Sequence, residues 1–261
     1  MKHAIITAGS KGLGRKVTQH FLKNGCSVTV NYRSDEERVE QLKKEWRPFE
    51  EQILFVQGDV TKKEDIVKII DQTIEKFGRI DFLINNAGPY IFHKKKLVDY
   101  TDDEWYEMIE GNLSAVFHFV KRVIPIMRKQ KFGRIITYGF QDAEHTPGWM
   151  YRSAFSAAKV GLVSLTRTIA LEEAEYGITA NMVSPGDIKG EKKELDIETA
   201  KTMKDPNTPV GRPGTGEDIA RLIGFLCDEN SDMITGSVVS AAGGVHVANR
   251  IDDLSEESVR L

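Results

Sequence analysis

The sequence is poor in cysteine, with Cys26 and Cys227 as its two examples among 261 residues. Two cysteines exclude a disulfide-dense secreted scaffold and fit a chain that folds in a reducing cytoplasm. No stretch approaches the ~20 apolar residues that a membrane-spanning helix needs, and the apolar run at residues 4–6 is too short for a signal-peptide core. We therefore expect a cytoplasmic protein without a membrane partner.

An excess of charge of one sign is also lacking. The chain has 36 Lys and Arg against 39 Asp and Glu, which gives a net charge of -3, so no basic excess directs it to nucleic acid. The six histidines show no metal-ligand spacing such as H-E-x-x-H, and we expect no metal site. The hydrophobic content of 40% is ordinary for a globular chain that can bury one large core.

Short apolar runs alternate along the chain with longer amphipathic stretches. The short runs predict strands at residues 3–8, 27–32, 53–57, 81–85, 133–138, 179–184 and 237–241. The longer stretches predict helices at residues 12–23, 36–46, 63–77, 103–129, 150–176 and 217–227. This alternation predicts right-handed βαβ units in an α/β fold, a single Rossmann-type doubly wound parallel sheet with helices on both faces.

The chain shows no internal repeat and no interior boundary, so residues 1–248 are expected to form one domain. Segment 186–216 is rich in Lys, Glu, Pro and Gly and interrupts the alternation of strands and helices. An insert of this length in a compact domain is often a substrate lid, or else disordered. Residues 249–261 are polar and acidic and predict a C-terminal tail that frays or lies along a neighbouring subunit.

The first chemical motif is the glycine-rich stretch Thr7-Ala8-Gly9-Ser10-Lys11-Gly12-Leu13-Gly14. It follows a predicted strand and opens a predicted helix. Glycines there permit a tight turn and a close approach to a pyrophosphate, and the helix start supplies free N–H groups and the positive end of its dipole. The stretch predicts a dinucleotide site, although an ordinary strand-to-helix turn would have the same glycines.

The residues after the second predicted strand indicate which dinucleotide would bind. Sites that prefer NAD place a carboxylate about 20 residues after the glycine turn, at the ribose 2′-hydroxyl. Here Arg33 and Ser34 occupy this position, and Lys11 lies in the turn. Two cations and a hydroxyl suit a 2′-phosphate, so we predict NADPH. The alternative is that Arg33 and Lys11 are solvated surface charges.

Further motifs resemble the classical short-chain dehydrogenase/reductase family. The spacing G-x-x-x-G-x-G of the turn and the segment Asn85-Asn86-Ala87-Gly88 after the fourth predicted strand carry the resemblance. It continues in order over roughly residues 1–247 and is nearest to bacterial 3-oxoacyl-(acyl-carrier-protein) reductases. It implies an NADP-binding domain, an oxidoreductase that reduces a small-molecule or acyl-carrier-linked carbonyl in fatty acid metabolism, and a homo-oligomer, either a tetramer or a dimer.

The resemblance also implies roles for individual residues. Asn112 in Gly111-Asn112-Leu113 looks like the catalytic asparagine, and Lys159 looks like the catalytic lysine that also holds the cofactor ribose. Asp59 and Val60 look like the adenine contact. The implied cofactor contacts as a whole, together with those argued from the turn, are Thr7, Gly9, Ser10, Lys11, Gly12, Leu13, Gly14, Arg33, Ser34, Asp59, Val60, Asn85, Ala87, Gly88, Lys159, Pro185, Gly186 and Ile188.

Two hydroxyl groups of the family pattern are missing. The family has a tyrosine four residues before the lysine, on the same helix face, and a serine at the end of the fifth strand. Here these positions hold Phe155 and Phe140. Phenylalanine has no proton to donate, and a positioned general acid is typically worth about 10²–10⁴ in rate. Carbonyl reduction would therefore need an atypical proton donor.

Two tyrosines are candidates for this proton donor. Tyr151 lies eight residues before Lys159, a poor pairing on one continuous helix, but the Pro-Gly pair before it could delay the helix start and let it fold back. Enoyl-type reductases of the family also space their tyrosine and lysine more widely, which keeps an enoyl reductase with a displaced Tyr151 open. Tyr138 is expected on the same strand face as Phe140, where core packing is the favoured interpretation.

A protein without turnover is the remaining alternative. Loss of both hydroxyls with the cofactor motifs retained would also describe a catalytically impaired NADPH-binding sensor or partner subunit.

Overall fold

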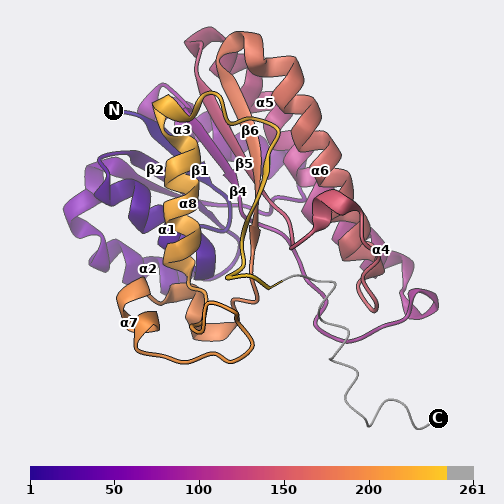
Figure 1. Ribbon diagram of the computed structural model, residues 1–261. Coiled ribbons are helices and arrows are strands. Elements are labelled where there is room, and N and C mark those ends of the chain that lie inside the picture. The colour runs from indigo at the N-terminus through magenta and orange to yellow at the C-terminus, as the bar shows by residue number, and fades with distance from the viewer. Residues whose placement is uncertain (246–261) are drawn as a thin grey trace, which may run out of the picture.

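The computed structural model describes residues 1–245 (Figure 1). Seven parallel strands form one sheet in the order β3-β2-β1-β4-β5-β6-β7. The strands are β1 (His3–Ile6), β2 (Ser27–Tyr32), β3 (Ile53–Gln57), β4 (Phe82–Asn85), β5 (Gly133–Tyr138), β6 (Ile178–Pro185) and β7 (Val238–Ala241). The predicted doubly wound α/β fold is confirmed.

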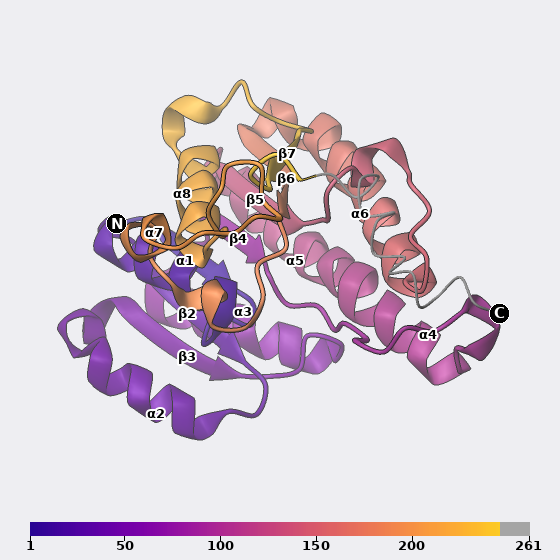
Figure 2. The same ribbon diagram turned by 60° about the horizontal axis from the view of Figure 1, so that its bottom comes forward.

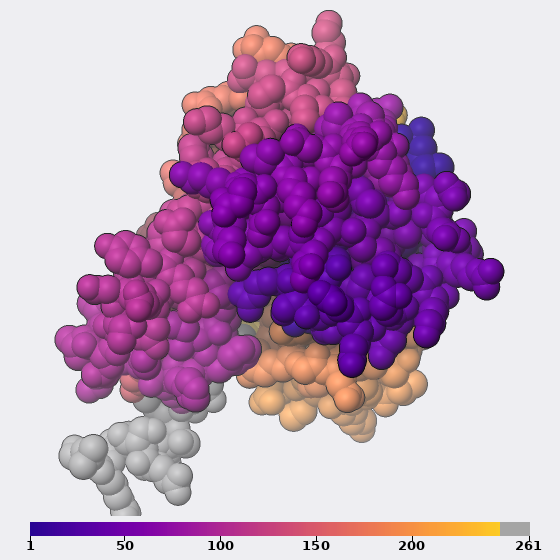
Figure 3. Space-filling view, turned by 180° about the vertical axis from the view of Figure 1, so that it is seen from behind, coloured from indigo at the N-terminus to yellow at the C-terminus, as the bar shows by residue number. Residues whose placement is uncertain are grey.

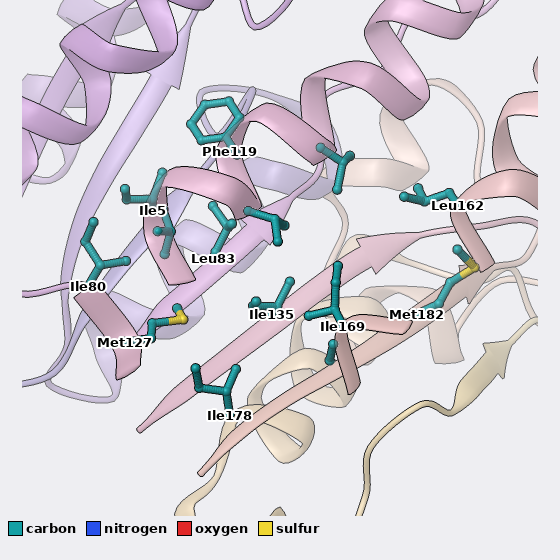
Figure 4. Packing of buried hydrophobic residues seen from close by; sticks show 14 of the residues in the cluster. Ile5, Ile80, Leu83, Phe119, Met127, Ile135, Leu162, Ile169, Ile178 and Met182 are labelled. Carbon is teal, nitrogen blue, oxygen red and sulfur yellow. The ribbon is translucent and has the colours of Figure 1, made fainter. Parts of the chain in front are cut away.

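Eight α-helices connect and cover the strands within the described residues. They are α1 (Gly12–Lys23), α2 (Glu36–Glu45), α3 (Lys63–Phe77), α4 (Asp102–Ile109), α5 (Ala115–Gln130), α6 (Ser153–Glu173), α7 (Ile197–Lys201) and α8 (Gly216–Cys227). One hydrophobic cluster joins the sheet to α3, α5 and α6, and Figure 4 shows part of it. A second cluster joins the opposite face to α1, α2 and α8.

The register of the sheet explains why the central strands β1, β4 and β5 carry apolar residues at successive positions. Ile5 pairs with Leu83, and Leu83 with Ile135, all three on the α5 and α6 face. Their chain neighbours, such as Ile6 and Ile84, point to the opposite face because successive side chains of a strand alternate. Both faces are covered by helices, so both sets of positions must be apolar.

Two helices differ from the prediction, one in its continuity and the other in the residue at which it begins. The helix expected over residues 103–129 is α4 and α5 joined by a π-helical segment, Glu110–Ser114. The helix expected from residue 150 begins only at Ser153, because Tyr151 adopts a left-handed backbone with φ of 65° that cannot start a right-handed helix. The stretch Ser153–Tyr176 has the length and apolar composition of a membrane span, but half of its most apolar part is buried in the fold.

The predicted insert 186–216 is more regular than expected. It contains a 3₁₀ turn, Gly190–Glu194, and the short helix α7. It lies beside the N-terminal part of α1 at the edge where the strands end (Figure 2), and its orange surface meets the indigo surface of the N-terminal region in Figure 3. The predicted tail, residues 249–261, lies outside the described residues.

Candidate functional site

The glycine-rich turn between β1 and α1 is tied to the segment that follows β4. The side-chain amide of Asn86 donates to the carbonyls of Thr7 at 2.9 Å and Ala8 at 3.2 Å. The backbone N–H of Ala87 donates to the Thr7 hydroxyl at 2.9 Å. A Cβ on Gly14 would lie 2.4 Å from the Ala8 carbonyl oxygen, so this close packing requires glycine. The two predicted cofactor segments therefore form one unit.

The start of α1 provides an anion site. Its N-cap residue, Lys11, makes no side-chain cap, and the first turn contains no acidic residue. Instead, Oε1 of Glu194 in the insert accepts a hydrogen bond of 2.8 Å from the Gly12 N–H. Oε2 of Glu194 accepts hydrogen bonds from Arg15 at 3.1 Å and Arg38 at 2.8 Å.

This contact tests whether the turn fits a dinucleotide. Helix N–H groups and two guanidinium groups surround a carboxylate, and a pyrophosphate has the same charge sign and acceptor chemistry. The site therefore fits the phosphates of a dinucleotide. Sequence reasoning missed Glu194, Arg15 and Arg38, because 182 residues separate Glu194 from Gly12 and no local pattern pairs them.

The predicted contacts to the 2′-phosphate lie at the same edge of the sheet. Lys11 is exposed after β1, and Arg33 and Ser34 are exposed directly after β2. Burial raises the pKa of Asp59, but hydrogen bonds from Thr61 and the positive charge of Arg33 outweigh it and hold that pKa below its usual value. Arg33 is therefore electrostatically coupled to the predicted adenine contact.

A small cavity of about 10 Å³ lies between the glycine-rich turn, the end of β4 and α5. It brings together four of the predicted cofactor residues with side chains of α5; its lining is Thr7, Val60, Asn85, Ala87, Ala115, Val116 and Phe119.

Asn112 and Lys159 converge on Gly88, the last residue of the segment after β4. A Cβ built on Gly88 would lie 2.4 Å from Asn112 Oδ1 and 3.7 Å from Lys159 Nζ. The Asn112 amide donates to the carbonyls of Pro89 and Met108, each at 3.0 Å. Its Oδ1 is buried and has no donor among the described residues. Most buried acceptors are paired in folded proteins, so this oxygen is a candidate acceptor for a hydrogen bond from a bound ligand.

Lys159 is buried on α6, with 5% of its surface exposed. Burial away from water lowers the pKa of its ammonium from 10.5 to about 8. Within residues 1–245 it forms no ion pair, and its Nζ lies 5.6 Å from the centroid of the Phe155 ring. A buried, uncompensated amine next to an unpaired amide oxygen suits a hydroxyl-rich ligand such as a ribose.

Phe155 and Phe140 belong to one aromatic cluster beside Lys159. The Phe140 ring lies 4.9 Å from the Trp149 ring and 6.3 Å from the Phe155 ring, measured between centroids. The Tyr90 ring packs edge-on against Phe155 at 4.9 Å. We call these four residues, Tyr90, Phe140, Trp149 and Phe155, the aromatic cluster.

The expectation that Tyr138 shares a face with Phe140 is wrong. Tyr138 is buried in the cluster with α1 and α8, whereas Phe140 packs on the α5 and α6 side. The strand alternation stops because β5 ends at Tyr138 and the chain turns at Gly139. The Tyr138 hydroxyl is buried without a partner among the described residues, and burial raises its pKa.

Tyr151 lies outside α6, as expected if the helix starts late. It is half-buried, and the ammonium of Lys94 lies 6.0 Å from the centroid of its ring. The hydroxyl of Tyr100 donates to its carbonyl at 3.4 Å. These contacts connect Tyr151 to the loop before α4, and its role as proton donor stays a prediction.

The turn after β6, which carries the predicted cofactor contacts Gly186 and Ile188, borders a cavity of about 760 Å³. Gly186 packs tightly there, since a Cβ would lie 2.9 Å from the Cα of Ala242, and Ile188 is buried. The cavity is enclosed by the turn, by residues 205–214 of the insert and by residues 241–245 after β7. Neither Asn112 nor Lys159 lines it, so the cavity that the insert shapes is separate from the pair that converges on Gly88.

Comparisons with known proteins agree with this geometry. Residues 7–246 match the family described as enoyl-(acyl carrier protein) reductase. The chain is 67% identical over 251 residues to YtkK of Bacillus subtilis, which is named only provisionally as an oxidoreductase; the match covers 96% of this chain and 98% of YtkK. It is 31% identical over 247 residues to the 3-oxoacyl-(acyl-carrier-protein) reductase FabG of Staphylococcus epidermidis, covering 94% of this chain and 99% of FabG.

Solved structures give the same result. A Bacillus thuringiensis structure, provisionally named a 3-oxoacyl reductase, is 60% identical with a TM-score of 0.89 and covers 94% of this chain and 98% of its own. ElxO with NADP bound is 32% identical with a TM-score of 0.80 and covers 93% and 98%. A Tyr-to-Phe variant of ElxO with NADPH bound is 33% identical, with a TM-score of 0.81 and the same coverage.

Proposed function

Because the chain belongs to the short-chain dehydrogenase/reductase family of oxidoreductases, we propose that it is an NADPH-dependent reductase of a carbonyl group whose proton donor is not the family tyrosine. The substrate class is a ketone or a 3-oxoacyl thioester, free or linked to an acyl carrier. The observation that carries the proposal is the convergence of Asn112 Oδ1 and Lys159 Nζ on Gly88, beside an anion site at the start of α1.

The preference for NADPH rests on charge. Lys11, Arg33 and Ser34 offer two cations and a hydroxyl at the edge where a 2′-phosphate would lie, and no acidic side chain replaces them there. Arg15 and Arg38 add two cations at the neighbouring phosphate position. ElxO, a relative of similar fold, binds NADP.

Bound NADPH would supply the hydride. Lys159 would hold the cofactor ribose through its ammonium, and the Gly88 backbone would pass beneath it without a side chain in the way. Asn112 would accept a hydrogen bond at Oδ1, from water or from a ligand hydroxyl. Phe155 stands four residues before Lys159, where the family has its tyrosine, and contributes an apolar wall instead of a hydroxyl.

The test is turnover of NADPH by the purified protein with ketones, 3-oxoacyl thioesters and enoyl thioesters. We expect oxidation of NADPH, followed at its nicotinamide absorbance, with at least one carbonyl substrate. Turnover with enoyl thioesters alone would favour the enoyl-type alternative, which the description of the matching family supports. No oxidation above background across the panel would contradict both.

A second candidate is an NADPH-binding sensor or partner subunit without turnover. The observation that favours it is the packing of Phe140 against Phe155, at the two positions where the family resemblance implies hydroxyls. The Tyr-to-Phe variant of ElxO binds NADPH, so the loss of a tyrosine leaves cofactor binding intact in a relative. Binding of NADPH without turnover on the panel would favour this candidate. A homo-oligomer, a tetramer or a dimer, and a location in the cytoplasm remain proposals from the family resemblance.

A further inference from the structure

Tyr90 supplies a hydroxyl to the aromatic cluster, whose other members, Phe140, Trp149 and Phe155, have none. It follows Gly88 by two residues, and its half-buried ring packs edge-on against Phe155 at 4.9 Å with an angle of 86° between the ring planes. Phe155 in turn lies against the ammonium of Lys159. The Phe155 ring therefore contacts both the Tyr90 ring and the ammonium of the buried Lys159. Tyr90 lies on the chain segment that also carries Gly88.

Arg152 holds this phenol in a defined orientation. Its Nε donates a hydrogen bond of 2.6 Å to Tyr90 Oη, and its guanidinium carbon lies 5.0 Å from the Tyr90 ring centroid. The other nitrogens of Arg152 donate to the carbonyls of Phe92, His93 and Tyr151 at 2.9–3.1 Å. The contacts with Tyr90, Phe92 and His93 join the loop after β4 to the turn before α6.

The direction of the Arg152 hydrogen bond leaves the proton of Tyr90 available. A guanidinium has five N–H donors and no acceptor, so Tyr90 Oη accepts from Arg152 and keeps its own O–H for another acceptor. None of the hydrogen bonds among the described residues uses this O–H as a donor. This arrangement supplies what an acid catalyst needs, a free proton and a cationic partner for its conjugate base.

We propose that Tyr90 is the proton donor of this enzyme and that Arg152 is its positioning residue, an inference that rests on the reductase function proposed above. The hydride of NADPH would form the new C–H bond at the carbonyl carbon. The electron pair of the C=O π bond would form the O–H bond with the proton of Tyr90. The phenolate left on Tyr90 faces the Arg152 guanidinium at hydrogen-bond distance and regains its proton from water.

Tyr90→Phe is the direct test, because it removes one oxygen and retains the ring against Phe155. The matched control is Tyr100→Phe, which removes a hydroxyl from the same region. We expect kcat of Tyr90→Phe to fall by about 10²–10⁴, with the affinity for NADPH unchanged and the control within about threefold of the wild type. If Tyr90→Phe retained wild-type turnover, the role of Tyr90 would be refuted.

A binding measurement without turnover gives an independent readout. In the complex with NADP⁺ the protein cannot reduce a ketone, and Trp149 in the aromatic cluster reports ketone binding by its fluorescence. Loss of one neutral hydrogen bond predicts that Tyr90→Phe binds the ketone about 2–10-fold more weakly, while NADP⁺ affinity is unchanged. Equal ketone affinity in wild type and Tyr90→Phe would contradict a hydrogen bond from Tyr90 to the carbonyl.

Arg152 is tested by comparing Arg152→Lys with Arg152→Gln. We expect the lysine variant to retain more turnover than the glutamine variant at a similar melting temperature, because lysine keeps the positive charge beside the phenolate. Equal losses of turnover in both variants would mean that Arg152 only holds the loop after β4 in place and that its charge does not assist the reaction. Absence of turnover in the wild type itself would remove the reductase function and this role together, whereas wild-type turnover that survives Tyr90→Phe would remove this role alone.

Discussion

Replacement of Glu194 by Gln should tighten NADPH binding while it destabilises the free protein. Glu194 occupies the start of α1, so a pyrophosphate can reach the Gly12 N–H only after this carboxylate leaves. Glutamine has the same size, but it lacks the negative charge that Arg15 and Arg38 contact. The free energy that holds Glu194 in place therefore opposes cofactor binding in the wild type and is reduced in the variant.

The magnitude follows from the contacts of Glu194. Hydrogen bonds to charged groups contribute about 1.5–3 kcal/mol, and solvent screening reduces this value because the side chain of Glu194 is 29% exposed and that of Arg38 is 29% exposed. We expect Glu194→Gln to lose roughly 1–2 kcal/mol of stability without cofactor and to gain the same amount in NADPH affinity, about 5–30-fold. One change thus has opposite effects on the two quantities.

Titration calorimetry with NADPH and thermal melting without it measure both effects. The matched control is Glu198→Gln, which removes an exposed carboxylate of the same insert that pairs with Lys201. We expect the control to match the wild type in both measurements. An NADPH affinity of Glu194→Gln equal to or weaker than that of the wild type would refute the overlap of this carboxylate with the cofactor.

Three further changes test other parts of the site. Gly14→Ala should abolish NADPH binding in a titration, because its Cβ would lie 2.4 Å from the Ala8 carbonyl oxygen; wild-type affinity would contradict the tight turn. Phe140→Ser should lower the free energy of unfolding in urea by about 3–5 kcal/mol, since it empties a buried aromatic position; a loss below 1 kcal/mol would contradict the packing. The pKa of Lys159 is about 8 in the folded protein and 10.5 without burial. Between these pH values the unfolded chain binds more protons than the folded protein, so the free energy of unfolding rises with pH, by up to about 3 kcal/mol. Urea titrations from pH 7 to 10 should show this rise in the wild type and not in Lys159→Met; parallel curves would contradict the burial of a titrating amine.

The sheet was predictable because its strands are buried on both faces. Short runs rich in apolar and β-branched residues, such as 27–32 and 133–138, match the bounds of β2 and β5, and the glycines of the first turn have a local role that spacing reveals. The π-helical segment around Asn112 was not predictable, because it depends on side-chain hydrogen bonds to Pro89 and Met108 rather than on periodicity.

The contacts that distinguish this site join segments that are distant in the sequence. Glu194 reaches α1 across 182 residues, and Arg152 reaches Tyr90 across 62. Neither pair shares a helix face or a strand register, so no pattern in the chain could indicate it. Tyr138 was misplaced for a related reason: strand alternation predicts a face only while the strand continues, and β5 ends at Tyr138.

The most direct test of the central claim is titration calorimetry of the wild-type protein with NADPH and with NADH. The claim is that the start of α1, which receives no side-chain cap from Lys11, binds a phosphorylated dinucleotide together with Lys11 and Arg33. We predict a saturable binding heat with NADPH at one site per chain and an affinity for NADH at least tenfold weaker. Absence of binding heat with both cofactors would contradict the account.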